Sequence, residues 1–207
     1  MPIPTPPLLY LASKSPRRRA LLEQIGVSHQ VLLLREAAPR GPDVSELLLP
    51  NELAHDYVAR VTQEKAAMAW QVMQWRNLAH LPVLAADTSV LLGQQVLGKP
   101  ANRADAIAML SQLSGTTHQV LTCIALRTAD GMHTASQCSE VSFAELSAAT
   151  IAAYCDSAEP YDKAGGYGIQ GGAARFISHI NGSYSGIMGL PLFETCQLLR
   201  ASHILTS

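Results

Sequence analysis

Short apolar runs alternate along the whole chain with stretches of helical periodicity. The apolar runs predict strands over residues 8–12, 30–34, 81–86, 90–92, 96–97, 117–127, 136–145 and 176–180. Stretches in which apolar residues recur every three or four positions predict helices over residues 15–25, 51–74, 102–113, 147–156 and 192–199. Strands and helices that alternate in this way favour an α/β domain with a mixed sheet and flanking helices.

Turn residues support several of these boundaries. Ser15 is a good N-cap and Pro16 suits the first position of a helix. Asp130 and Gly131 lie between the two longest predicted strands, so we expect a hairpin that marks a second lobe. Residues 35–50 contain three prolines and show no clear period, which predicts a surface loop that could act as a mobile lid.

Length and charge narrow the class of protein. The chain has 207 residues, and we expect a single domain over residues 1–207 in which residues 1–7 form a flexible N-terminal extension. The 15 Lys and Arg residues balance 16 Asp and Glu residues, and the net charge of -1 argues against a nucleic-acid surface. Neither a secretion signal nor an apolar run of membrane-spanning length is found. We therefore expect a cytoplasmic protein that binds neither nucleic acid nor a membrane.

The strongest local signal is the sequence SKSPRRR over residues 13–19, where the first predicted strand passes into a helix. Free amide hydrogens and the positive end of the helix dipole attract an anion, and guanidinium groups can hold phosphate oxygens through paired hydrogen bonds. The alternative is a solvated basic first turn, although cations at a helix N-terminus oppose the dipole and usually need an anionic partner. The residues alone leave both interpretations open.

Asp87 follows the predicted strand over residues 81–86 and is followed by the hydroxyl of Thr88. A carboxylate at a strand end can bind a divalent cation or take a proton from an attacking water. An aspartate that only caps a turn is the more common case at this spacing. Lys65 and Lys99 could neutralise charge on a transferring phosphoryl group, or could be surface lysines.

A second polar segment, DKAGGYGIQG over residues 162–171, combines glycines with mixed polar side chains. Glycine permits positive φ and a close approach of the backbone to a ligand. Gln170 offers a donor and an acceptor that could read the edge of a base. A flexible hinge is the alternative, but a hinge does not explain so many polar side chains.

Six segments resemble the Maf-like nucleotide pyrophosphatases, in the same order and over nearly the whole chain. They read LASKSPRR, AADT, LGKP, LSGTTHQV, YDKAGGYGIQG and INGSYSGIMGLP. The resemblance implies an elongated mixed α/β fold with a cleft between two lobes, related to the inosine triphosphate pyrophosphatases, and a homodimer. It also implies that a nucleoside triphosphate is cut to the monophosphate and pyrophosphate with a divalent cation, Mg²⁺ or Mn²⁺.

The resemblance also implies residue roles. The phosphate-binding motif falls on Ser13, Ser15, Pro16, Arg17 and Arg18, the catalytic residues on Asp87, Lys65 and Lys99, and further substrate contacts on Thr88, Asp162, Lys163 and Gln170. The branch that acts on dTTP and UTP is similar to this chain at Arg17, Thr88 and Gln170, where a branch acting on 7-methyl-GTP has Trp, Gln and Glu. The family often carries paired acidic residues after the second strand, where this chain has Glu36 alone. We therefore expect Asp87 and Glu36 as metal ligands.

These roles predict hydrolysis of dTTP and UTP, and of modified pyrimidine triphosphates, in house-cleaning of the nucleotide pool. Asp87 would activate the water, and the basic residues would hold the charge that moves to the leaving group. One alternative is a pyrophosphatase of different base specificity, such as 7-methyl-GTP. Another is a nucleotide-binding regulatory protein in cell division. Asp87 and the two lysines favour turnover, because a sensor needs no base for water.

Overall fold

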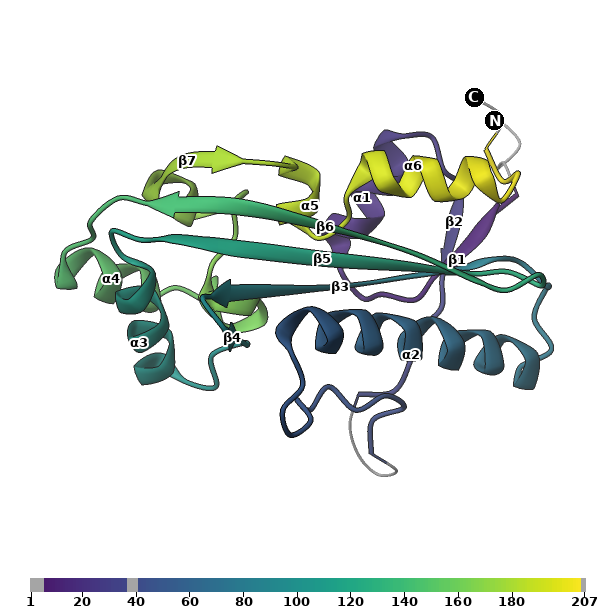
Figure 1. Cartoon of the computed structure of the whole chain (residues 1–207), viewed down its shortest axis with the longest axis horizontal. Helices are drawn as coiled ribbons and strands as arrows, with labels where there is room; N and C mark the ends of the chain where they lie inside the picture. The colour runs from purple at the N-terminus through teal and green to yellow at the C-terminus, as the bar shows by residue number, and fades with distance from the viewer. Residues whose placement is uncertain (1–5, 37–40, 206–207) are drawn as a thin grey trace. The chain divides into compact units, whose positions relative to one another are not determined.

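The computed structural model describes residues 6–36 and 41–205, so most of the expected extension over residues 1–7 lies outside the described part. Its elements are labelled in Figure 1. The described strands are β1 (Leu9–Leu11), β2 (His29–Val31), β3 (Val83–Leu92), β4 (Gln95–Leu97), β5 (Thr117–Arg127), β6 (Met132–Phe143) and β7 (Ile177–Asn181). The described α-helices are α1 (Pro16–Gln24), α2 (Ala54–Trp75), α3 (Arg103–Leu113), α4 (Ala148–Cys155), α5 (Tyr184–Met188) and α6 (Leu192–Ala201).

The strands form one mixed sheet in the order β2-β1-β3-β5-β6-β7, with β4 paired to β3. β1 runs parallel to both of its neighbours, with Leu9 opposite His29 and Tyr10 opposite Val83. β4 and β7 are antiparallel to β3 and β6, with Val90 opposite Leu97 in the first of these pairs. The predicted α/β class with a mixed sheet is therefore confirmed.

The chain divides into two compact units. Unit 1 comprises Met1–Asp87, Cys123–Ser136 and Gly189–Ser207, and unit 2 comprises Thr88–Thr122 and Gln137–Met188. β3, β5 and β6 contribute residues to both units. The single domain expected over residues 1–207 stays a prediction.

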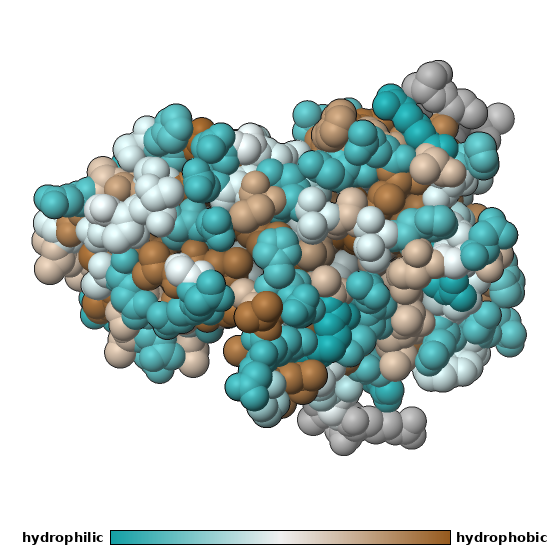
Figure 2. Space-filling model, viewed as in Figure 1, coloured by the Kyte–Doolittle hydropathy of each residue, from teal (hydrophilic) through white to brown (hydrophobic). Residues whose placement is uncertain are grey.

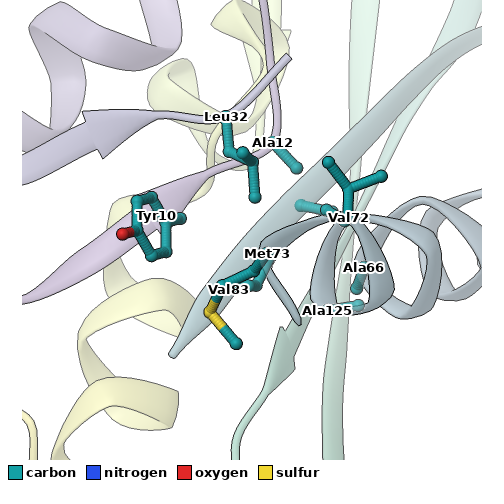
Figure 3. Packing of buried hydrophobic residues seen from close by; sticks show 10 residues of the cluster. Tyr10, Ala12, Leu32, Ala66, Val72, Met73, Val83 and Ala125 are labelled. Carbon is teal, nitrogen blue, oxygen red and sulfur yellow. The ribbon is translucent and has the colours of Figure 1, made fainter. Parts of the chain in front are cut away.

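The core of unit 1 packs α2 against the strands. Its buried cluster contains Ala66, Ala69, Val72 and Met73 of α2 with Tyr10, Ala12, Leu32, Val83, Ala85 and Ala125. Figure 3 shows Met73 reaching from the helix to Val83 on β3. In unit 1, α2 lies on one side of the strands and α1 and α6 lie on the other (Figure 1). Packing along one side of the helix therefore fixes its position on the sheet, and with it the position of Lys65.

Unit 2 has an aromatic core around the buried side chain of His118 on β5. The His118 ring stacks edge to face on Phe143 of β6 and on Tyr167, and its Nε2 lies 2.6 Å from the Tyr167 hydroxyl. Burial lowers the pKa of His118 to about 4 and raises the pKa of Tyr167. Tyr167 belongs to the glycine-rich segment, so its contacts with His118 and Phe143 hold that segment against the sheet of unit 2.

The structure corrects several predicted boundaries and adds one α-helix. β2 spans His29–Val31 rather than residues 30–34, and α2 begins at Ala54 rather than at residue 51. The predicted strand end at Asp87 is wrong, because β3 continues through Asp87 and Thr88 to Leu92. Threonine and the apolar residues after it favour extended backbone, and the Asp87 carboxylate is paired, so nothing ends the strand there. β6 begins at Met132 rather than at residue 136, and α5 was not predicted.

The predicted loop over residues 35–50 contains neither helix nor strand in its described parts, residues 35–36 and 41–50, and residues 51–53 continue it to the start of α2. It exposes four leucines, Leu47, Leu48, Leu49 and Leu53. Figure 2 shows hydrophobic surface over the segment that precedes α2. Among the described residues, no helix combines the length and the apolar composition needed to cross a bilayer.

Candidate active site

The predicted phosphate-binding motif lies at the start of α1. Ser15 is the N-cap, and its hydroxyl accepts a hydrogen bond from the backbone amide of Arg18 over 3.4 Å. The Ser13 hydroxyl accepts one from the amide of Ser15 over 3.1 Å, and Pro16 starts the helix. Both predicted serines therefore hold the backbone turn at the N-terminus of α1, where an anion is favoured.

Arg18 is held from two sides within unit 1. Its Nε donates to the carbonyl oxygen of Gly189 over 2.7 Å, and a terminal nitrogen donates to the Ser13 hydroxyl over 3.2 Å. Burial lowers the pKa of Arg18, and the negative charges of Asp87 and Glu46 oppose that effect. The guanidinium therefore has a fixed orientation and lies in the field of two carboxylates.

Lys65 of α2 joins those two carboxylates. Its Nζ lies 2.6 Å from Oδ1 of Asp87 and 2.7 Å from Oε1 of Glu46. The side chains of Lys65 and Asp87 are only 16% and 15% exposed, whereas that of Glu46 is 51% exposed. Partial burial strengthens the attraction between these charges relative to a pair in open water. The structure thus brings together the predicted residues Lys65 and Asp87 and adds Glu46.

Tyr57 of α2 binds the backbone of Glu46. Its hydroxyl donates to the backbone carbonyl of Glu46 over 3.0 Å. Burial raises the pKa of Tyr57, and the charges of Asp87 and Glu46 raise it further. Neither Tyr57 nor Glu46 was predicted as a site residue. Glu46 lies in the segment that carries no periodic pattern, so the sequence alone gives no sign that it reaches Lys65.

Glu36, predicted as a metal ligand, forms an ion pair with Lys14. Its Oε2 lies 2.7 Å from Nζ of Lys14, and both side chains are more than half exposed. Within residues 6–36 and 41–205, no group of three or more His, Cys, Asp or Glu side chains is arranged to hold a metal ion. Asp87 and Glu46 both contact the Lys65 ammonium, so they are the pair of carboxylates to consider as metal ligands.

Arg17 is partly buried on α1 in unit 1, and the other predicted residues lie in unit 2. The hydroxyl of Thr88 lies 2.9 Å from that of Thr122, which donates to the carbonyl of Gly186 over 2.8 Å. Lys99 is exposed just after β4. Thr88 is therefore fixed by its neighbours, whereas Lys99 projects towards solvent.

The glycine-rich segment is organised by Glu159, a residue that the sequence did not single out. The Glu159 carboxylate accepts from the Tyr154 hydroxyl over 2.9 Å and from the amide of Gly172 over 2.8 Å. Its backbone carbonyl accepts from Nζ of Lys163, which also pairs with Asp162. A Cβ at Gly171 would overlap the Glu159 carboxylate, so that carboxylate would have to move if the glycine were replaced. Gln170 itself is exposed.

The comparisons with known proteins decide the family. A family model described as "Maf-like protein" matches residues 8–202. The chain belongs to the Maf-like family. It is 56% identical to a dTTP/UTP pyrophosphatase of Bordetella avium, covering 96% of each chain. It is 50% identical to proteins of the same name from Cupriavidus pinatubonensis, covering 95% of this chain and 97% of that protein, and from Nitrosomonas europaea, covering 95% of each.

Among solved structures, this Maf-like chain is similar to the Staphylococcus aureus Ham1 protein, with a TM-score of 0.39 and 15% identity over 66% of this chain and 72% of that one. A similarity this low bears on neither the fold nor the function. The resemblance to the Maf-like family predicted from the sequence motifs is confirmed by the family model and the relatives.

Proposed function

We propose that this protein is a nucleoside triphosphate pyrophosphatase that cuts dTTP and UTP to the monophosphate and pyrophosphate. The Lys65–Asp87 pair carries the proposal, because it provides a carboxylate fixed by a neighbouring cation, as a general base requires. The relatives named dTTP/UTP pyrophosphatase match this chain over nearly its full length, which supports the choice of substrates. Modified pyrimidine triphosphates, and with them house-cleaning of the nucleotide pool, extend the same proposal.

Phosphate binding is assigned to the N-terminus of α1 with Arg17 and Arg18. The helix has no acidic residue in its first turn, and two arginines there oppose the helix dipole. A triphosphate would remove this conflict, because its oxygens can accept from both the helix amides and the guanidinium groups. In unit 2, Lys99 is proposed as a catalytic residue that offsets charge on the transferring phosphoryl group, and Asp162 and Lys163 are proposed as further substrate contacts, all on the strength of the family motifs.

The chemical step follows from the charge on Asp87. Its carboxylate would accept a proton from a water whose oxygen attacks the α-phosphorus. A new bond forms between that oxygen and phosphorus, the bond from the α-phosphorus to the bridging oxygen breaks, and pyrophosphate leaves with the electron pair. Lys65 would hold the Asp87 carboxylate in place and, with Arg18, would offset the negative charge that develops on the phosphate oxygens.

A divalent cation fits the carboxylates of Asp87 and Glu46. Both carboxylates reach the same ammonium nitrogen, and Mg²⁺ is commonly held by one or two carboxylates together with the phosphates of a substrate. When bound, Mg²⁺ or Mn²⁺ would polarise the phosphate oxygens. Glu46 is better supported in this role than Glu36, which pairs with Lys14.

The first test of the proposal is product analysis with dTTP and UTP. We expect pyrophosphate and the monophosphate as products, and we expect EDTA to abolish turnover and added Mg²⁺ or Mn²⁺ to restore it. Pyrophosphate detection beside anion-exchange chromatography measures both products. Inorganic phosphate as the first product, or full activity after complete chelation, would refute the scheme.

The same assay tests the alternatives. A panel that includes 7-methyl-GTP would reveal a different base specificity. Tight binding of a triphosphate without turnover would indicate a regulatory nucleotide-binding protein instead. Homodimer formation and a cytoplasmic location also stay predictions.

Base selection is assigned to Gln170 with Thr88. We expect Gln170→Glu to lower kcat/KM for dTTP and UTP more than for purine triphosphates, because a carboxylate repels the carbonyl oxygens of a pyrimidine and cannot donate to them. Steady-state kinetics over a panel of triphosphates measures this difference. Gln94→Glu is the matched control, since it makes the same change of charge at an exposed turn of unit 2. Equal losses for every base would mean that Gln170 supports the segment and does not read the base.

A further inference from the structure

A two-point ion pair lies at the start of α2. Nε of Arg60 donates to Oε1 of Glu52 over 2.6 Å, and a terminal nitrogen of Arg60 donates to Oε2 over 2.9 Å. The side chains are 23% and 9% exposed. Paired hydrogen bonds between a guanidinium and a carboxylate are strong and fix direction, and partial burial reduces screening by water.

The same two side chains also bind the backbone of the preceding segment. Arg60 donates to the carbonyl of Leu47 over 3.0 Å, and the Glu52 carboxylate accepts from the amide of Leu49 over 3.0 Å. In this stretch the side chains of Leu47, Leu48 and Leu49 are all half or more exposed. Burial of apolar surface therefore contributes little to holding this stretch, and hydrogen bonds to Arg60 and Glu52 must do so.

Glu46 lies immediately before this anchored stretch. Its backbone carbonyl accepts from Tyr57, and its carboxylate reaches Nζ of Lys65 beside Asp87. Arg60 and Tyr57 lie on α2, as Lys65 does, so one helix presents both the anchor points and the cation. The position of the Glu46 carboxylate thus depends on where the Arg60–Glu52 pair fixes the backbone.

We propose that Arg60 and Glu52 act together as a clamp that positions Glu46 beside Lys65 and Asp87, which makes them positioning residues for the reaction. The proposal rests on the proposed function, in which Glu46 takes part in binding the metal and the triphosphate. The Arg60 guanidinium lowers the pKa of Glu52 to about 2, and Glu52 in turn raises the pKa of Arg60. The clamp therefore stays charged across the neutral range and loosens only as the pH falls towards 2.

A purely structural role is the competing explanation. The N-cap of α2, Leu53, makes no side-chain capping bond, so the clamp could serve only to stabilise the start of the helix. In that case its loss would affect the enzyme independently of Glu46. A double-mutant cycle separates the two roles, because only a clamp that acts through Glu46 loses its effect once the Glu46 carboxylate is removed.

The experiment compares Glu52→Gln, Glu46→Gln and the double variant in the full-length protein. We expect Glu52→Gln to lower kcat/KM for dTTP roughly ten- to hundredfold, because a displacement of about 1 Å at a reacting group can cost this much. We expect the double variant to match Glu46→Gln alone within about twofold. Glu64→Gln is the matched control, since Glu64 contacts the same guanidinium over 3.3 Å but does not bind the segment, and it should keep wild-type kinetics. Losses that multiply in the double variant would overturn the proposal.

Two measurements without substrate keep the test independent of the enzymatic activity. Hydrogen–deuterium exchange should be faster over residues 46–49 in Glu52→Gln than in wild type or in Glu64→Gln. Calorimetric titration with Mn²⁺ alone should show weaker binding in Glu52→Gln. If the wild type releases no pyrophosphate, the proposed function fails, and these two measurements still decide whether the clamp positions Glu46.

Unchanged hydrogen–deuterium exchange together with unchanged Mn²⁺ affinity would overturn the clamp. Should Glu52→Gln fail to fold, Arg60→Lys offers the same test.

Discussion

Replacement of Asp87 by asparagine should leave the fold intact and reduce kcat at least about a hundredfold, because removal of a general base costs on the order of 10² to 10⁴ in rate. The amide keeps the volume of the side chain and can still accept a hydrogen bond from Lys65. It cannot take a proton from water, and it is a weaker ligand for a divalent cation than a carboxylate. Binding of the triphosphate should change less, since α1 and Arg18 are untouched.

Steady-state kinetics, calorimetric nucleotide binding and a thermal melt separate these effects. Asp130→Asn, the same substitution at an exposed turn, is the matched control and should behave as wild type. Near-normal kcat in folded Asp87→Asn protein would mean that another group activates the water. Glu46, which shares Lys65 with Asp87, would then be the first residue to replace.

Arg18→Gln should reduce kcat/KM on the order of 10²- to 10³-fold, the usual cost of removing one preorganised donor from a transition state. The guanidinium is held by Gly189 and Ser13, so no reorientation is needed when a phosphate binds. Its positive charge also lies in the field of Asp87 and Glu46. Without the Arg18 charge, less positive charge would offset the two carboxylates. Their repulsion of an approaching triphosphate would therefore increase.

Arg19→Gln provides the matched control, because Arg19 is the next residue of α1 and is exposed. We expect its kinetics to stay within about twofold of wild type, as is usual for an exposed substitution away from a binding site. Arg18→Lys adds a finer comparison, since it keeps the charge but loses the paired geometry of the guanidinium. Similar small effects for Arg18→Gln and Arg19→Gln would remove Arg18 from the proposed phosphate site.

The sequence predicts the regular elements well where the pattern is strong. β5 has the predicted bounds, Thr117–Arg127, because a long run of β-forming residues is closed by turn residues at both ends. α3 begins as expected, with the Asn102 side chain accepting from the amide of Asp105. Asp87 shows where local preference misleads, since an aspartate within an apolar run resembles a strand end. Its pairing with Lys65, far away in the sequence, allows the strand to continue.

The candidate site likewise contains some residues that the sequence predicts and others that it does not. Ser13, Ser15 and Arg18 lie in one short motif at the start of α1, so the sequence alone predicts that they lie close together in space. Glu46 and Arg60 could not be found in this manner. They act through contacts that exist only after α2 has packed on the sheet, and the segment before that helix has no periodic pattern to place it. Tertiary packing therefore decides which charged residues join the site.

The fit between Gly171 and Glu159 has an evolutionary consequence. Any side chain at Gly171 would enter the space of the Glu159 carboxylate, which also bonds Tyr154 and the amide of Gly172. A side chain at position 171 would therefore displace the Glu159 carboxylate from these bonds, whereas a shorter residue at position 159 would leave room for it. Substitutions at positions 159 and 171 would then be expected to occur together, and the backbone next to Gln170 would depend on this pair of residues.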